Sequence, residues 1–254
     1  MPDSFWQWVV FILNEYGGLF LTGLKNTMMI AVLSTVFGFL IGLLVASLRS
    51  IKVSRHEGAV KRICAKLLDI LLAVYVEVFR GTPMIVQAMV IYYGLFRNVD
   101  IGKMTAAVFI VSINTGSYMA EIIRGGILSV DKSQEEGAYS IGMTHSQALR
   151  YVILPQAIRN VMPSIGNEFV VNIKDSSVLS VISVFELFFA GKSASGTYLR
   201  YFEVNFIIAV IYLIVTYTVT RAMRLIEKKL EGPGVVTITG SQSDSRSVIT
   251  VRED

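Results

Sequence analysis

Two opposite charges beside a predicted helix break are the first candidates for chemistry in this sequence. Glu77 and Arg80 are three residues apart, so they share one face of a helix, and both interrupt apolar sequence in which a charge is costly. The break that follows contains Gly81, Thr82 and Pro83, and it frees backbone groups that can bind a solute or line a gate. The pair could hold the ammonium and carboxylate groups of an amino acid, or the two charges could simply neutralise each other.

Other polar residues fall inside apolar stretches further along the chain. Glu168 is expected near the middle of an apolar helix, with Asn167 and Asn172 close to it, so these three are predicted to line a pathway. Glu121 and Arg124 also share a helix face, but they fall nearer the expected cytoplasmic end. For them, a structural or coupling ion pair is the better interpretation.

The sequence lacks the residues that several classes of enzyme need. It has no Gly-x-x-x-x-Gly-Lys-Ser/Thr phosphate loop, so the chain is not expected to hydrolyse ATP itself. The two histidines, His56 and His145, lie outside the apolar stretches, and His145 is interpreted as a surface residue. Cys64 is the one cysteine, so neither a disulfide nor a cysteine metal site is expected. We therefore predict no catalytic residues, no metal site and no cofactor bound by this chain.

The composition and its distribution identify the chain as a membrane protein. Of its 254 residues, 53% are hydrophobic and 17% are charged, and the stretch 26–48 contains no charged residue. A helix of that length crosses a hydrocarbon core of roughly 30 Å. The blocks 81–96, 104–120 and 204–220 are apolar on every side, whereas a soluble core helix needs only one apolar stripe.

The positions of the basic residues predict the orientation. Residues 1–24 contain no Lys or Arg, whereas the segment 49–66 holds six of them against one acidic residue. Cytoplasmic loops carry the excess of positive charge, which places the N-terminus outside and the basic C-terminal end of the last span inside. We count five transmembrane helices, if 66–96 is one long helix broken at its Gly-Thr-Pro sequence. A membrane domain is therefore predicted over 1–230, followed by a cytoplasmic tail with little fixed structure over 231–254.

A polar stretch between the third and fourth predicted spans has the features of a helical hairpin. Asp131 or Ser133 can cap its first helix, Gly142 allows a turn, and Pro155 is predicted to restart a helix at its first turn. The segment displays apolar groups without a use inside this chain, which favours a docking partner; an ordinary connecting loop along the lipid headgroups is the alternative. The residues predicted to take part in coupling are Glu135, Glu136, Gly137, Ala138, Ile141, Gly142, Met143, Leu154 and Pro155.

This stretch resembles the EAA loop of ABC importer permeases. The pattern of that loop is Glu-Ala-Ala, a Gly six residues after the Glu, and Ile-x-Leu-Pro further on, and this sequence matches it with two departures. Gly137 replaces the first Ala, and Val152 replaces the Ile. The matching positions are Glu136, Ala138, Gly142, Leu154 and Pro155.

Further stretches are similar to permeases for polar amino acids of the histidine, glutamine and arginine type. The resemblance covers about Thr22 to Leu230, with its motifs in order at Val78–Pro83, Ala120–Ile127, Gly166–Phe169 and Lys174–Ser177. It implies the all-α fold of a type I ABC importer permease in the bacterial inner membrane, carrying glutamine, glutamate, histidine or arginine. It also implies a coupling helix seated on a dimer of cytoplasmic ATPase subunits that use ATP, a second permease that is identical or related, and an external amino-acid-binding protein.

Two other classes of function stay open at this point. An ion-coupled secondary transporter or channel would act from this chain alone and would need no ATPase. A membrane-embedded enzyme would need a nucleophile, a base or metal ligands at mid-membrane, and the sequence offers no such set. The resemblance is the main reason to favour the permease.

Overall fold

The computed structural model describes residues 2–50, 58–99, 101–230, 237–239 and 248–250, and its regular structure is almost entirely helical. The long helices are α1 (Phe5–Ser50), α2 (Ala59–Gly81), α4 (Lys103–Ser129), α7 (Leu154–Asp175) and α9 (Tyr201–Leu230). The shorter helices are α3 (Met84–Val90), α5 (Lys132–Ser140), α6 (His145–Ala148) and α8 (Leu187–Tyr198). Two π-helical turns, η1 (Ile91–Leu95) and η2 (Leu149–Ile153), and the 3-10 helix η3 (Ser176–Ile182) complete the helical elements.

The predicted tail over 231–254 is described only at two short strands. β1 (Thr237–Thr239) and β2 (Val248–Thr250) pair antiparallel. The other residues of the tail lie outside the described part of the chain. Little fixed structure in this tail therefore stays a prediction.

Three helices are long and apolar enough to cross a membrane, namely α1, α4 and α9. A fourth candidate is a bent pair, in which the helical run His145–Ile182 is followed by α8 at an angle of 52°. By length and composition, the described residues thus give three spans, or four with the bent pair, against the five that we predicted. The difference lies in the segment 66–96.

We expected one long helix, broken at the Gly-Thr-Pro sequence, in that segment. The structure has two separate helices there, α2 and α3. α2 begins at Ala59, and its 23 residues are long enough to cross a bilayer, although its charges keep it out of the apolar set. Pro83 has an extended backbone (φ −64°, ψ 135°) and no N–H, so α2 ends before it and α3 begins after it. Our predicted segment began only at residue 66, whereas α2 begins at Ala59, since Lys and Arg are good helix formers.

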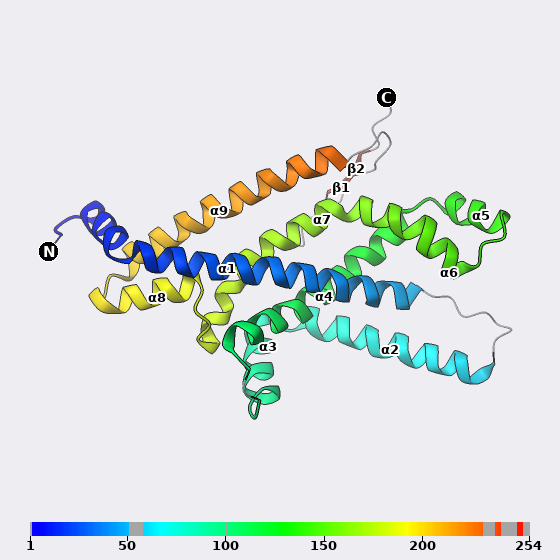
Figure 1. Cartoon of the computed structure of the whole chain (residues 1–254), viewed down its shortest axis with the longest axis horizontal. Helices are drawn as coiled ribbons and strands as arrows, with labels where there is room; N and C mark the ends of the chain where they lie inside the picture. The colour runs from blue at the N-terminus through cyan, green and yellow to red at the C-terminus, as the bar shows by residue number, and fades with distance from the viewer. Residues whose placement is uncertain (1, 51–57, 100, 231–236, 240–247, 251–254) are drawn as a thin grey trace. The chain divides into compact units, whose positions relative to one another are not determined.

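Contacts divide the chain into two compact units. Unit 1 comprises residues 1–36, 82–112 and 169–222, and unit 2 comprises residues 37–81, 113–168 and 223–254. In unit 1, the N-terminal part of α1 packs along α8 (Figure 1). The buried core of this contact contains Trp8, Ile12, Phe20, Leu187, Ala190 and Ala194.

In unit 2, α1, α2 and α4 pack closely around small residues. A Cβ added at Gly42 would overlap the side chain of Met119, so glycine is what permits this approach of α1 to α4. The hydroxyl of Tyr75 on α2 donates a 2.6 Å hydrogen bond to the backbone carbonyl of Ile113 on α4. These contacts fix the helices that carry the charged residues of the candidate site.

Candidate functional site

Glu121 on α4 is the centre of a charged cluster in unit 2. Arg124 donates to it from one turn further along, with Nη2 2.9 Å from Oε2 and Nε 3.1 Å from Oε1. Arg49 Nη1 lies 3.5 Å from Oε1, and Arg80 Nη1 lies 3.9 Å from Oε2. Glu121 and Arg124 thus form the predicted ion pair, but they do so within a larger cluster that gathers three arginines around one carboxylate.

The structure does not pair Glu77 with Arg80. Arg80 turns to Glu121 instead, and its guanidinium carbon lies 5.7 Å from the ring centre of Tyr118. Glu77 is exposed, and the described part of the chain supplies no ion pair to it. Helical neighbours three residues apart can each prefer a partner on another helix, and Arg80 does so here.

The break between α2 and α3 is closed by a side chain that the sequence analysis missed. Gln87 is buried, and its amide nitrogen lies 2.9 Å from the carbonyl oxygen of Thr82 and 2.8 Å from the hydroxyl of the same residue. It therefore satisfies a carbonyl group at the break. The sequence does contain a signal for this contact, because the amide side chain of Gln87 follows Pro83 by one helical turn.

The three predicted pathway residues of α7 do not share one environment. Glu168 and Asn172 are buried, whereas Asn167 is exposed. Asn172 donates a 2.9 Å hydrogen bond to the hydroxyl of Thr35. Adjacent residues on a helix point about 100° apart, so Asn167 and Glu168 cannot face the same surface. Asn167 is the member of this group that the chain leaves open to a ligand.

The predicted hairpin is present, and its two helices have strong caps. The carboxylate of Asp131 accepts the backbone N–H of Ser133 at 2.8 Å, and that bond lowers the pKa of Asp131. Gly142 has a φ of +83°, a left-handed backbone conformation that favours glycine. Thr144 then caps α6 in a capping box with Gln147. The turn between α5 and α6 is therefore well defined.

This turn displays apolar surface, as predicted. Ile141 is 75% exposed, and Tyr139 is also exposed. Ala138 is buried and serves the packing of the hairpin itself. Glu136 and Gly137 lie on the exposed side of α5. The exposed members of the predicted coupling set are thus Glu136, Gly137, Ile141, Gly142 and Pro155.

We predicted that Pro155 restarts a helix, and the structure shows instead that it lies within a continuous helical run. The helical run begins at His145 and continues through η2 into α7. The turn before Pro155 widens to the π form, in which the N–H of Leu154 donates to the carbonyl of Leu149, five residues back. A wider turn accommodates a residue that lacks an N–H and whose ring crowds the preceding turn. Pro155 therefore shapes the exit from the hairpin.

His145 is not the surface residue that we expected, because its side chain is only 19% exposed. Its Nε2 lies 2.9 Å from the backbone carbonyl oxygen of Ser50, and its Nδ1 lies 2.8 Å from the hydroxyl of Tyr139. The same hydroxyl donates to Glu135 at 2.6 Å, and this bond raises the pKa of Tyr139 to about 12. These contacts join the hairpin to the end of α1 within unit 2.

A buried carboxylate that the sequence analysis missed lies at the bend before α8. Glu186 is fully buried and caps α8, accepting the backbone N–H groups of Phe188 at 2.8 Å and Phe189 at 2.6 Å. Tyr212 on α9 donates its hydroxyl to the same carboxylate at 3.1 Å. A lone glutamate in an apolar stretch was the signal that could have found it.

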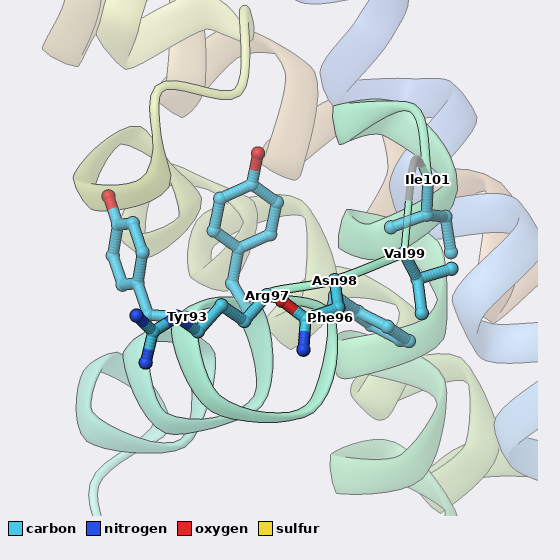
Figure 2. Close-up of a pocket in the computed structure, with 7 residues that line it drawn as sticks. Tyr93, Phe96, Arg97, Asn98, Val99 and Ile101 are labelled. Carbon is cyan, nitrogen blue, oxygen red and sulfur yellow. The ribbon is translucent and has the colours of Figure 1, made fainter.

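A pocket of about 530 Å³ opens beside η1 in unit 1. Figure 2 shows its lining side chains, which come from η1 and from the segment that leads to α4. They are Tyr92, Tyr93, Phe96, Arg97, Asn98, Val99 and Ile101. The guanidinium, amide and phenol groups can bind a carboxylate, and the rings can hold an apolar group. The residues predicted for the pathway are not among those that line it.

Known proteins are similar to this chain over most of its length. The family model described as the binding-protein-dependent transport system inner membrane component matches residues 62–232, a range that includes the whole hairpin. The glutamine transport system permease protein GlnP of Escherichia coli (strain K12) is 36% identical over 218 residues, which cover 84% of this chain and 93% of GlnP. The L-cystine transport system permease protein TcyB of Bacillus subtilis (strain 168) is 38% identical over 212 residues, covering 82% of this chain and 85% of TcyB.

A solved structure is similar as well. It is a crystal structure of an amino acid ABC transporter with histidines, with a TM-score of 0.76 and 38% sequence identity. The likeness covers 90% of this chain and 100% of the matched chain.

Proposed function

Because the chain belongs to the family of binding-protein-dependent transport system inner membrane components, we propose that it forms one side of a pathway that imports a polar amino acid. It is a multi-pass membrane protein and the permease subunit of an amino acid ABC importer, and the predicted all-α permease fold is confirmed. GlnP and TcyB are named for glutamine and cystine, both zwitterionic amino acids. We assign this chain a substrate of the glutamine, glutamate, histidine or arginine type. An external N-terminus and a cytoplasmic C-terminus stay predictions.

The exposed turn of the hairpin is the observation that supports our proposal that ATP drives this transport. Ile141 is 75% exposed and precedes Gly142 in the turn between α5 and α6, and both of these helices are capped. A large apolar side chain on a rigid support is suited to fill a groove on a partner. We assign that partner as a dimer of cytoplasmic ATPase subunits. ATP is used there, and the chain itself binds no cofactor.

Arg80 and Glu77 are the proposed contacts for the charged ends of the substrate. The side chain of Arg80 is 42% exposed and holds Glu121 only at 3.9 Å, so the carboxylate of an amino acid can compete for it. Glu77 is exposed and can accept the ammonium group. The backbone of Gly81, at the exposed end of α2, offers a further polar group.

The remaining partners follow from the importer architecture. A second permease, identical to this chain or related to it, supplies the other side of the pathway. An external binding protein delivers the amino acid, and the assembly lies in the bacterial inner membrane.

The coupling proposal is tested by two substitutions in the assembled transporter, Gly142→Val and Glu136→Lys. Valine at a φ of +83° is strained, which costs about 1–2 kcal/mol and distorts the turn. We expect amino acid uptake to fall by about tenfold in each variant, at unchanged membrane insertion. Gly125→Ala is the matched control, because Gly125 lies outside the predicted coupling set and its added methyl group would meet no atom within 4 Å. Normal uptake by both variants at normal expression would rule out coupling through the hairpin.

A further inference from the structure

Arg80 is the farthest from Glu121 of the three arginines that surround this carboxylate. Arg124 donates hydrogen bonds to both oxygens of Glu121, at 2.9 Å and 3.1 Å, and Arg49 lies 3.5 Å from Oε1. Arg80 lies 3.9 Å from Oε2, which is too long for a hydrogen bond, and its side chain is 42% exposed. A second carboxylate that reaches Arg80 can therefore accept from its N–H groups, in the bidentate geometry that guanidinium groups favour.

Glu121 does not depend on Arg80 for its counter-charge. If Arg80 turned away, the carboxylate would keep the paired hydrogen bonds of Arg124 and the charge of Arg49. A partly buried ion that loses its last partner is strongly destabilised, whereas the loss of one partner among three costs much less. One carboxylate can therefore replace another beside Arg80 while the rest of the cluster stays together.

The cluster also has an excess of positive charge. Arg49 has a second carboxylate partner, Asp69, at 3.1 Å, so the groups in contact among the described residues are three arginines and two carboxylates. Glu77 is the next carboxylate in the sequence, and the structure does not pair it with Arg80. One carboxylate brought by a substrate would balance this excess charge.

A ring on α4 helps to hold Arg80 at this place. Tyr118 and Glu121 are three positions apart on the helix, so they share one face of it. The guanidinium carbon of Arg80 lies 5.7 Å from the centre of the Tyr118 ring. The ring attracts the cation with or without Glu121, so Arg80 can stay beside α4 while the carboxylates exchange.

We propose that Glu121 is a positioning residue that competes with the substrate for Arg80. The proposal rests on the substrate contact of Arg80 proposed above. An incoming amino acid places its α-carboxylate beside Arg80, and Glu121 keeps its contacts with Arg124 and Arg49. On release, Glu121 pairs with Arg80 again and replaces the carboxylate that leaves. The internal carboxylate thus limits how tightly the amino acid is held, because a transport site must also let its substrate go.

The first experiment separates KM from kcat in ATP-driven uptake. The transporter is purified through a tag on this chain and reconstituted in liposomes, and the probes are L-glutamine, L-glutamate, L-histidine and L-arginine. Glu121→Gln keeps an acceptor for Arg124 but removes the charge that competes for Arg80. We expect the KM for the imported amino acid to fall by roughly two- to fivefold, the factor that an exposed ion pair supplies, and kcat to fall because release slows.

Asp69→Asn is the matched control for this variant. It removes a carboxylate of the same cluster, one whose contact in the described part of the chain is with Arg49. It should keep the KM of the unaltered chain. An unchanged or raised KM in Glu121→Gln would overturn the proposal, and so would an equal fall in Asp69→Asn. Damage to the structure alone would lower kcat without lowering KM.

The second experiment measures binding without ATP, so it does not require a working transport cycle. The purified transporter is equilibrated with the imported amino acid and, separately, with the α-carboxamide of the same amino acid. The carboxamide lacks the charge that competes with Glu121. We therefore expect Glu121→Gln to bind the amino acid roughly two- to fivefold more tightly and to bind the carboxamide as the unaltered chain does. An equal gain for both ligands, or no gain for either, would contradict the exchange at Arg80.

The two proposals can fail separately. Arg80→Gln removes the proposed substrate contact and should raise KM. If it does so while Glu121→Gln leaves KM unchanged, only the competing role of Glu121 is lost. If Arg80→Gln also leaves KM unchanged, the substrate contact itself is lost.

Discussion

Two carboxylate–tyrosine pairs in this chain have the same chemistry in opposite settings. In unit 1, the hydroxyl of Tyr212 donates to the fully buried Glu186 at 3.1 Å. On α5, the hydroxyl of Tyr139 donates to Glu135 at 2.6 Å, on the exposed surface of the hairpin. The two pairs therefore differ in burial and in what else contacts them.

The surroundings decide what each pair can do. Glu186 also accepts two backbone N–H groups in the first turn of α8, where the helix itself supplies no carbonyl acceptor. Tyr139 instead shares its hydroxyl with His145, a second polar side chain of the same hairpin. Burial makes the first pair a fixed structural element, whereas exposure leaves the second adjustable.

The largest difference between the pairs should appear when each carboxylate is removed. Glu186→Ala leaves two part-buried N–H groups and a part-buried hydroxyl without their acceptor, which should lower the free energy of unfolding by roughly 3 kcal/mol. Glu135→Ala, at the surface, should cost less than about 1 kcal/mol. Denaturant unfolding of both variants in detergent measures this, and equal losses would break the comparison.

A smaller contrast is expected for the tyrosines. Tyr212→Phe removes one hydrogen bond to a buried carboxylate and should cost about 2 kcal/mol. The same unfolding measurement applies, with Tyr217→Phe as a control, since that tyrosine is exposed on the same helix. A cost for Tyr212→Phe no larger than for the control would mean that the buried bond is not structural.

The smallest effect on stability is expected for Tyr139→Phe. At this exposed position, the free energy of unfolding should change by less than about 0.5 kcal/mol. Denaturant unfolding in detergent measures this change, and a loss as large as that of Tyr212→Phe would break the comparison.

The features that depend on local sequence could be predicted. The long apolar helices follow from uncharged stretches, and the hairpin follows from Asp131 as a cap and Gly142 as a turn, both of which the structure confirms. The membrane class and the family also follow from the sequence. Caps and turns are decided within a few residues, which is why sequence patterns reach them.

The features that depend on tertiary contact could not be predicted. Arg80 forms an ion pair with Glu121, on a different helix, rather than with its helical neighbour Glu77. His145 is half-buried because it meets the end of α1, and Glu186 is satisfied by the backbone of the helix that it begins. Partners that folding brings together leave no spacing signal in the sequence.

The most direct test of the central claim, that a partner ATPase drives this permease through its hairpin, is a pull-down of the full chain in mild detergent. ATPase activity is then measured on the proteins that co-purify. We predict a stoichiometric ATPase subunit, lost when the exposed apolar group of the turn is replaced by a charge in Ile141→Asp. A chain that purifies alone, and that moves amino acids into liposomes without ATP, would contradict this account.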